Sequence, residues 1–176
     1  MYMYDKLFGE YNHTVAQMLM TGADFENEER HTNFDNTLNR LLEFGVLPII
    51  NENDTIATSE IKVGDNDTLS AIIATSANAD LLILLSDIDG LYTADPRKQA
   101  DASLIPVVKE INEDIMKLAG AAGTSRGTGG MITKLHAAQI CMDAGIDMII
   151  SNGSNPEVLY DIFDGKSVGT RFTKKG

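Results

Sequence analysis

Short apolar runs alternate along this chain with segments in which apolar residues recur at helical spacing. The run Leu81–Leu85 contains no polar residue, which is typical of a strand that helices cover on both faces. Within Thr68–Ala77, by contrast, Leu69, Ile72 and Ile73 fall on one face of a helix. This alternation predicts an α/β protein in which helices and strands follow one another.

The same pattern predicts the individual elements. Helices are predicted over Met1–Tyr11, Asn36–Phe44, Thr68–Ala77, Glu113–Leu118, Thr133–Ala144 and Pro156–Phe163. Strands are predicted over His13–Met20, Val46–Ile50, Asp80–Leu85, Leu104–Val108, Met148–Ile150 and Gly169–Phe172. This order predicts one domain over residues 1–176, a three-layer αβα sandwich with a mainly parallel open sheet. Ligands in such folds bind in loops at the carboxyl ends of strands.

Composition narrows the class of protein. The formal net charge of -12 argues against nucleic acid as a partner, because phosphate backbones are bound by a surplus of Lys and Arg. The single cysteine, Cys141, excludes an internal disulfide and is expected to be a small core residue on a helix. No apolar run approaches the roughly 20 residues that span a membrane, and no secretion signal is visible. We therefore expect a cytoplasmic protein.

Two short polar segments lie where such a fold binds ligands. Asn51-Glu52-Asn53-Asp54 follows the predicted strand Val46–Ile50, although a plain loop is also rich in Asn and Asp. Gly64-Asp65-Asn66-Asp67 precedes the predicted helix at Thr68, where one Asp or Asn could serve as an N-cap. Three such residues in succession exceed the need of one cap. Two carboxylates and an amide there could hold an ammonium group and orient lysines.

A glycine-rich segment, Gly123–Lys134, precedes and enters the next long predicted helix. The glycines at positions 127, 129 and 130 free the backbone to curve its N–H groups around an anion, and the helix presents its positive dipole end there. Lys134, one turn into the helix, could reach a transferring phosphoryl group. The segment is not a Walker A loop, and a flexible surface loop is the alternative interpretation.

The segment after the most apolar predicted strand also carries polar groups. Ser86 and Asp87 come at the carboxyl end of Asp80–Leu85, where they could hydrogen-bond a ribose or a base. The following Asp89-Gly90 could be only a turn.

Taken together, these motifs resemble the amino acid kinase family over nearly the whole chain. The strand with Ser-Asp and then Gly-Leu-Tyr-Thr-Ala-Asp-Pro-Arg looks like the nucleotide-binding segment of that family. Gly-Thr-Gly-Gly-Met-Ile-Thr-Lys looks like its phosphate loop and catalytic lysine. Within the family, Asn-Glu-Asn-Asp followed by Lys-Val-Gly-Asp-Asn-Asp is similar to glutamate 5-kinases.

The resemblance implies a fold like that of carbamate kinase and a role for each motif. It implies ATP-dependent phosphorylation of the side-chain carboxylate of L-glutamate, the first step of proline biosynthesis, with Mg²⁺ arriving on ATP. The catalytic residues implied are Lys134 and Asp67. The substrate-binding residues implied are Asp54 and Asn66, with Asp65 and Asn51 beside them. The nucleotide-binding residues implied are Ser86, Asp87, Thr128, Gly129, Gly130, Met131, Ile132, Thr133 and Lys134. No protein-bound metal is expected. A homo-oligomer is expected, and proline is a candidate feedback inhibitor.

The chain departs from the family pattern at its beginning. Family members open with a strand that carries a second lysine and a glycine-rich turn, and no such segment stands before Asn51. We therefore expect an N-terminally truncated kinase domain that is inactive or nearly so by itself, without the RNA-binding-like domain that some members append. The alternatives are an acetylglutamate, aspartate or uridylate kinase, a nucleotide- or amino-acid-binding module without turnover, and a fragment that associates with a partner.

Overall fold

A computed structural model of the protein describes residues 1–53, 65–121 and 130–174. The chain forms two compact units, Met1–Leu69 and Ser70–Gly176, and each is described by itself. The first unit holds α1 (Tyr2–Gly9), β1 (Val15–Met20), α2 (Gly22–Glu26), α3 (Glu28–Glu43) and β2 (Leu47–Glu52). Helix α4 (Asn66–Ser76) crosses the boundary. The second unit holds β3 (Leu81–Ser86), β4 (Val107–Val108), α5 (Glu113–Ala121), α6 (Met131–Asp143), β5 (Asp147–Asn152), α7 (Val158–Phe163) and β6 (Thr170–Phe172).

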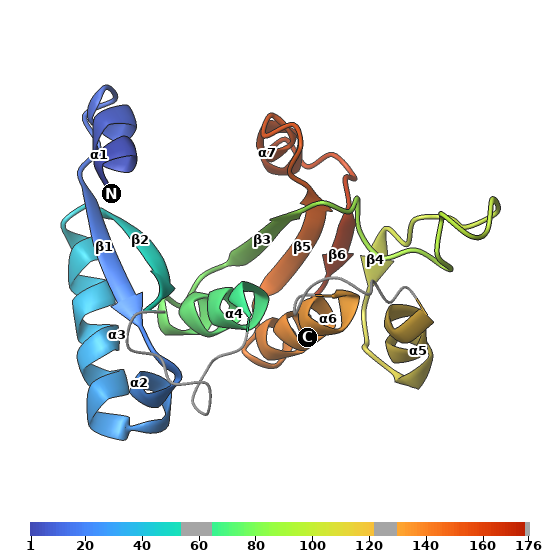
Figure 1. The fold of residues 1–176 in the computed structure, drawn as a ribbon, viewed down its shortest axis with the longest axis horizontal. Helices are drawn as coiled ribbons and strands as arrows, with labels where there is room; N and C mark the ends of the chain where they lie inside the picture. Colours follow the sequence, from blue (N-terminus) through green and yellow to red (C-terminus); the bar gives the residue numbers. More distant parts are fainter. Residues whose placement is uncertain (54–64, 122–129, 175–176) are drawn as a thin grey trace. The chain divides into compact units, whose positions relative to one another are not determined.

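In the first unit, β1 and β2 form a parallel pair that α2 and α3 connect (Figure 1). The pairing is in register from Val15 opposite Leu47 to Met20 opposite Glu52. A parallel pair requires such a crossover, because the chain must return to the same end of the sheet before the second strand begins. The second strand includes the predicted substrate residue Asn51, which lies one residue before the carboxyl end of β2.

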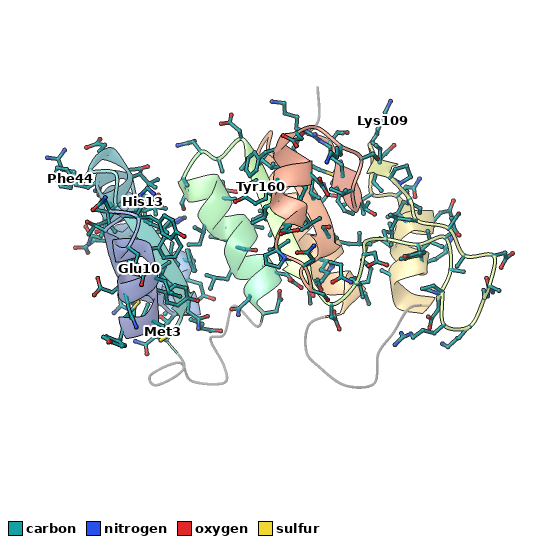
Figure 2. All side chains as sticks on the ribbon, turned by 90° about the horizontal axis from the view of Figure 1, so that it is seen from above. Met3, Glu10, His13, Phe44, Lys109 and Tyr160 are labelled. Atoms are coloured by element: carbon teal, nitrogen blue, oxygen red, sulfur yellow. The ribbon has the colours of Figure 1, made fainter. Side chains whose placement is uncertain are left out.

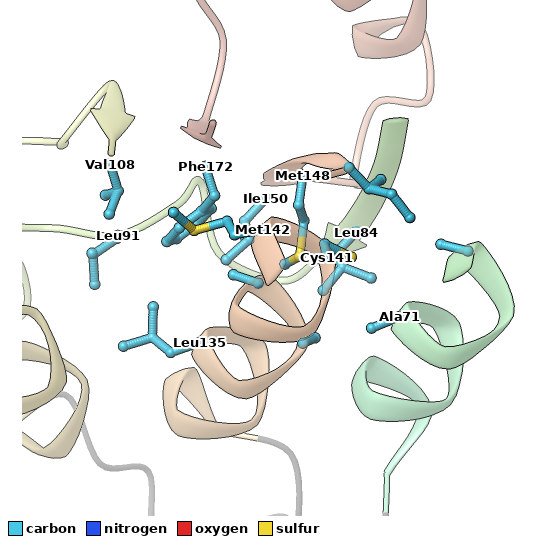
Figure 3. Packing of buried hydrophobic residues seen from close by; sticks show 14 of the residues in the cluster. Ala71, Leu84, Leu91, Val108, Leu135, Cys141, Met142, Met148, Ile150 and Phe172 are labelled. Carbon is cyan, nitrogen blue, oxygen red and sulfur yellow. The ribbon is translucent and has the colours of Figure 1, made fainter. Parts of the chain in front are cut away.

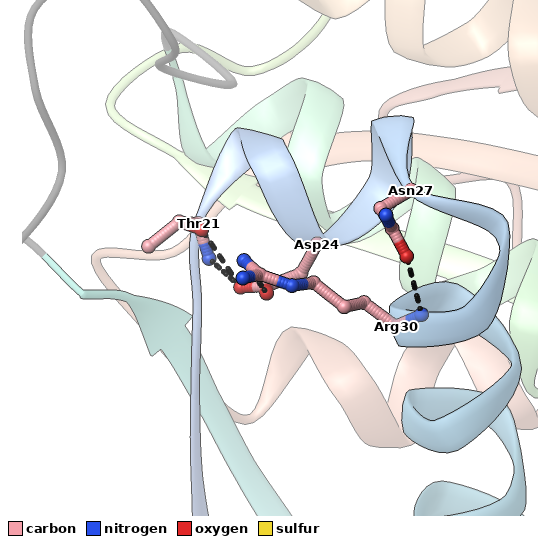
Figure 4. Close-up of polar contacts among 4 residues, drawn as sticks. All are labelled: Thr21, Asp24, Asn27 and Arg30. Carbon is pink, nitrogen blue, oxygen red and sulfur yellow. Dashed lines mark hydrogen bonds and ion pairs between the residues drawn. The ribbon is translucent and has the colours of Figure 1, made fainter.

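Two helix starts in this unit are held by side-chain hydrogen bonds (Figure 4). The Asp24 carboxylate accepts hydrogen bonds from both N–H and Oγ1 of Thr21, each at 2.7 Å, before α2. The Asn27 side chain accepts one from the backbone N–H of Arg30 at 3.0 Å, at the start of α3. The predicted helix at Asn36 was therefore placed too late, and α2 was missed. These Thr, Asp and Asn side chains satisfy N–H groups that a helix start otherwise leaves without partners.

In the second unit, a four-stranded sheet has the order β3-β5-β6-β4. Strand β5 runs parallel to β3, β4 runs parallel to β6, and only the β5–β6 pair is antiparallel. Figure 1 draws α6 and α7 on opposite sides of β5. The prediction of an α/β fold with mainly parallel strands is confirmed, although the described strands form two sheets.

The core of the second unit lies between α6 and the sheet (Figure 3). Leu135 and Met142 of α6 pack into one cluster with Met148 and Ile150 of β5 and Phe172 of β6, and each is at least 99% buried. Leu135, Ala138 and Met142 all lie on the buried side of this helix. Cys141 is also buried, as predicted, and burial raises the pKa of its thiol to about 11.

Tight turns reverse the chain between helices and the strands that follow them. After α6, the N–H of Gly145 donates to the Met142 carbonyl and that of Ile146 to the Cys141 carbonyl, while Gly145 adopts a φ of 77°. This hydrogen-bond pattern is the Schellman motif, and its left-handed residue is most often glycine. This turn reverses the chain just before β5 begins at Asp147, so α6 and β5 run in opposite directions.

The strand predicted over Leu104–Val108 is shorter in the structure. Only Val107 and Val108 form β4, while Leu104 makes an isolated antiparallel bridge with Tyr92. Pro106 stands between these two segments and has no N–H to donate to a ladder, so the pairing is interrupted there.

Side chains on the surface include several large apolar groups. Met3, Phe44 and Tyr160 are labelled in Figure 2, and all three are more than half exposed. Among the described residues, no helix combines the length and the apolar character that crossing a membrane requires.

Thr170, a fully buried polar residue, ties three segments of the second unit together. Its hydroxyl Oγ1 accepts a hydrogen bond from the N–H of Leu91 at 2.8 Å and donates one to the carbonyl of Ile105 at 2.7 Å. Both partners lie in the long connection between β3 and β4. The side chain thus anchors this connection to β6.

We predict that Thr170→Val lowers the free energy of unfolding by about 1–3 kcal/mol, because it leaves two backbone groups without this partner while nearly preserving shape. Thr173→Val is the matched control, since the Thr173 side chain is half-buried and makes no hydrogen bond among the described residues. Urea unfolding followed by circular dichroism measures both variants. Equal stability of the two variants contradicts the anchoring role.

Candidate functional site

The carboxyl ends of β3 and β5 meet at one edge of the second unit's sheet. Ser86 lies opposite Asn152 in the parallel register, and the N–H of Gly153 donates to the Ser86 carbonyl at 2.8 Å. The Ser86 hydroxyl donates to the Asp87 carboxylate at 3.1 Å. Because α6 runs opposite to β5, its N-terminus lies toward the same edge. Ser86, Asp87 and the start of α6 therefore lie at the edge where the sequence predicted a ligand.

The first turn of α6 carries the predicted catalytic lysine. Gly130 precedes the helix, and the Thr133 hydroxyl donates to the Gly130 carbonyl at 2.7 Å. Lys134 is only 7% exposed, and lysine is rarely so buried unless it is paired or used. Met131 packs against the core cluster, while Ile132 is exposed. These features agree with a helix start that presents N–H groups and a lysine to an anion. Thr128 and Gly129 lie outside the described residues.

Asp89 joins the segment after β3 to the end of β5. Its carboxylate accepts hydrogen bonds from the Asn152 side-chain amide at 2.9 Å and from the Tyr92 hydroxyl at 2.8 Å. These two bonds, that from Asn152 first, lower the pKa of Asp89, and the Asp89 carboxylate raises the pKa of Tyr92. Sequence reasoning treated Asp89 as part of a turn, and it missed Asn152 because the predicted strand stopped at Ile150.

A cavity of about 470 Å³ opens beside this joint. Asp89, Ser151 and Asn152 contribute to its wall from the ends of β3 and β5, and Val158 and Asp161 contribute from α7. Ser151 is 97% buried, and its side chain makes no hydrogen bond among the described residues. The wall contains carboxylates, amides and hydroxyls but no Lys, Arg or His. It therefore suits hydrogen-bond donors better than anionic groups.

The predicted substrate residues that the structure describes belong to the first unit. Asn51 is exposed in β2, opposite Leu19. Two residues later, the N–H of Asn53 donates to the Met20 carbonyl at 2.6 Å, which holds the end of β2 against β1. Asp54 lies outside the described residues.

Asp65 caps helix α4. One carboxylate oxygen accepts a hydrogen bond from the N–H of Thr68 at 2.7 Å, and the other accepts one from the Thr68 hydroxyl at 3.0 Å. Asn66 and Asp67 form the first turn of the same helix, with Asn66 exposed and Asp67 half-buried. Acidic groups at a helix start are favoured by the helix dipole. The structure thus shows the capping interpretation for Asp65.

The part of the chain that the structure describes holds no group of three or more His, Cys, Asp or Glu side chains that could bind a metal ion.

Comparison with known proteins gives one family. The model of the amino acid kinase family matches residues 1–152. The chain is similar to the glutamate 5-kinase of Clostridium perfringens, with 52% identity over 99% of this chain and 66% of that protein. It is similar to the glutamate 5-kinase of Clostridium tetani, with 55% identity over 98% of this chain and 64% of that protein. The chain spans about half to two thirds of the length of the curated relatives that it matches.

Solved structures show the same fold at lower identity. The UMP kinase of Ureaplasma parvum matches with a TM-score of 0.63 and 14% identity, over 97% of this chain and 64% of that chain. Carbamate kinase of Giardia lamblia bound to AMP-PNP matches with a TM-score of 0.59 and 25% identity, over 80% of this chain and 44% of that chain. The prediction of a carbamate kinase-like fold is therefore confirmed.

We predict that the two interpretations of Asp65 separate in its variants. Asp65→Ala loses the cap and lowers the free energy of unfolding by roughly 0.5–2 kcal/mol, whereas Asp65→Asn keeps most of it, because Asn caps helices about as well as Asp. Thermal unfolding of both variants measures the capping role. If Asp65→Asn is as unstable as Asp65→Ala, the carboxylate charge has a structural role beyond the cap.

Proposed function

Because the chain belongs to the amino acid kinase family, we propose that it acts as a kinase domain that transfers the γ-phosphoryl group of ATP to the side-chain carboxylate of L-glutamate. The product is glutamyl 5-phosphate. The observation that carries this proposal is the identity of 52–55% to glutamate 5-kinases over 97–100% of the chain. Kinases for UMP match the fold at only 14–23% identity, so the acceptor proposed is glutamate.

The acceptor residues proposed are Asp54 and Asn66, with Asp65 and Asn51 beside them. Glutamate carries an ammonium group, which carboxylates bind by charge-assisted hydrogen bonds, and carboxylates, which amide N–H groups can bind. Asn66 is exposed at the start of α4 and is available for such a contact. Asp65 contributes to the same helix start while it also caps α4.

The nucleotide residues proposed are Ser86 and Asp87 at the end of β3 and residues 128–134 around the start of α6. The Giardia carbamate kinase, which shares the fold, is bound to an ATP analogue in its crystal structure. Parallel α/β sheets bind ligands at this edge. Helix N-termini bind phosphates through their free N–H groups and their dipole. Both arguments support a nucleotide site at the edge that Ser86 and Gly130 share.

In the reaction, an oxygen of the glutamate side-chain carboxylate attacks the γ-phosphorus of ATP, the bond to the β-phosphate oxygen breaks, and ADP leaves. Lys134 acts on the charge of the transferring group, which is the main contribution that a protein makes to phosphoryl transfer. For Asp67 we propose the role that the family resemblance implies, which is to orient the side chains of catalytic lysines. We propose that Mg²⁺ arrives bound to ATP, where it neutralises charge on the phosphates.

The proposal extends to the cellular role. Glutamyl phosphate formation opens proline biosynthesis in the relatives that carry this activity, and we propose the same role here, in the cytoplasm. A homo-oligomer and inhibition by proline belong to the same proposal.

The acceptor can be tested in a chimera in which this chain replaces its matching region in the Clostridium perfringens relative. We predict that the chimera consumes ATP with L-glutamate and forms a hydroxamate when hydroxylamine is present. N-acetylglutamate, aspartate and UMP should give less than about a hundredth of that rate, because a site that hydrogen-bonds its substrate rejects analogues that leave its polar groups unpaired. The unmodified relative is the positive control. A folded chimera that prefers another acceptor contradicts the proposed substrate.

We predict that Lys134→Met in the chimera lowers kcat on the order of 100-fold or more and changes the KM for ATP little, since a charge acting on the transition state contributes mainly to rate. Methionine keeps most of the buried stem, and Lys134→Ala should show the same kinetic loss. Lys117→Ala is the control, because Lys117 is an exposed lysine paired with Asp114 on its own helix. Near-normal turnover with weak ATP binding means that Lys134 only anchors phosphates in the ground state.

A further inference from the structure

The segment from Ser86 to Tyr92, called the β3 loop below, is held at three points. At its start, the Ser86 carbonyl accepts from Gly153. Near its end, the N–H of Leu91 donates to the Thr170 hydroxyl, and the Leu91 carbonyl accepts from Ile105 at 2.8 Å. Between these backbone anchors, the Asp89 carboxylate joins the loop to the end of β5 by accepting from the Asn152 amide, and it accepts a second hydrogen bond from Tyr92 within the loop.

Close packing at Gly90 restricts how the β3 loop can move. Gly90 adopts a φ of 153°, and a Cβ atom built there would lie 2.5 Å from Oγ1 of Thr170. The backbone of the loop therefore lies directly against β6 on one side. Asp89 and Asn152, which are joined by a hydrogen bond, both line the 470 Å³ cavity. Loss of this hydrogen bond leaves Asp87 and Asp89 without a side-chain tie to β5 between the backbone anchors at Ser86 and Leu91.

The first half of the loop contains Ser86 and Asp87, the residues proposed to hold the nucleotide. Asp87 is exposed, and among the described residues its side chain is hydrogen-bonded to the neighbouring Ser86 alone. Neither side chain by itself ties the loop to another element. The backbone of Ser86 is held by the pairing of β3 with β5. Asp87 has no such anchor, so its position depends on what holds the turn that follows it. A loop that must become ordered on binding weakens the affinity for its ligand, because the conformational entropy that the loop loses makes the free energy of binding less favourable.

We propose that Asp89 is a positioning residue for nucleotide binding, which holds Asp87 in place next to Ser86 through its hydrogen bonds to Asn152 and Tyr92. The inference rests on the proposed nucleotide site at the end of β3. Asp89 acts through the loop and does not need to touch the nucleotide.

Asn152→Asp tests the joint with little change of shape. The new carboxylate can still accept the hydrogen bond that the Asn152 side chain takes from the N–H of Ser154. It loses the amide donor to Asp89 and places a second negative charge beside it. Asn155→Asp is the matched control, because Asn155 lies in the same cavity wall, accepts from the N–H of Glu157 through its side-chain oxygen and, among the described residues, is not hydrogen-bonded to Asp89.

The measurement is the affinity of the 176-residue chain for MgATP by isothermal titration calorimetry. We expect Asn152→Asp to raise the Kd about tenfold, because it removes one hydrogen bond to a charged group and the free energy of such a bond corresponds to about that factor. Asn155→Asp should stay within about twofold of the wild-type chain. Tyr92→Phe removes only the hydroxyl and should raise the Kd about threefold, which keeps the test available if Asn152→Asp does not fold.

A double-mutant cycle separates positioning from a merely structural effect. We expect Asp89→Ala and Asn152→Ala to weaken MgATP binding by similar factors, and the double variant to be no weaker than either one. In the chimera, these variants should raise the KM for ATP and leave the KM for glutamate unchanged. Additive effects, or equal affinity of the wild-type chain and Asn152→Asp, contradict the inference alone. A wild-type chain that binds no MgATP contradicts the proposed nucleotide site and the inference together.

Discussion

Helix α6 packs against β5 through side chains that are almost wholly buried on both elements, and most of the second unit follows from this contact. Leu135 and Met142 meet Met148 and Ile150, and the tight turn at Gly145 makes the helix and strand antiparallel. An antiparallel helix brings its N-terminus to the edge where the strands end. Apolar burial, worth about 25 cal/mol per Å², therefore also brings the N-terminus of α6, with its positive dipole end, to the edge of the sheet where Ser86 lies. Packing and the proposed chemistry depend on the same few residues.

Much of this arrangement could be predicted from the sequence, because periodicity reports burial. The apolar positions of α6 and the unbroken run Leu81–Leu85 predicted both elements within two residues. The start of α3 was placed eight residues late, since Glu28–Asp35 is mostly polar and its helix is held by the Asn27 cap and by two buried residues, Phe34 and Leu38. Hydrophobic periodicity is weak in such a segment. The Asn27 and Thr21 caps were the available signals, and they were not used.

The candidate site was predictable to a different degree in each part. Motifs that are contiguous in sequence, such as Gly130–Lys134, could be recognised because local chemistry is enough to suggest an anion site. The joint from Asp89 to Asn152 could not, because its partners are 63 residues apart and meet only through the register of β3 with β5. Asp65 shows a third case: its capping bonds are local and were foreseen as an alternative, yet sequence alone could not decide between cap and substrate contact.

The net negative charge of the chain limits which groups can attract ATP to the proposed site. A protein with a formal net charge of -12 repels ATP at long range, so binding must come from groups close to the phosphates. The start of α6 has such groups, namely the first N–H groups of the helix and the buried Lys134. A carboxylate near the phosphates weakens ATP binding less when hydrogen-bond donors already stabilise its charge. Asp89 accepts two such hydrogen bonds. The two hydrogen bonds that Asp89 accepts therefore also disperse its negative charge near the proposed site.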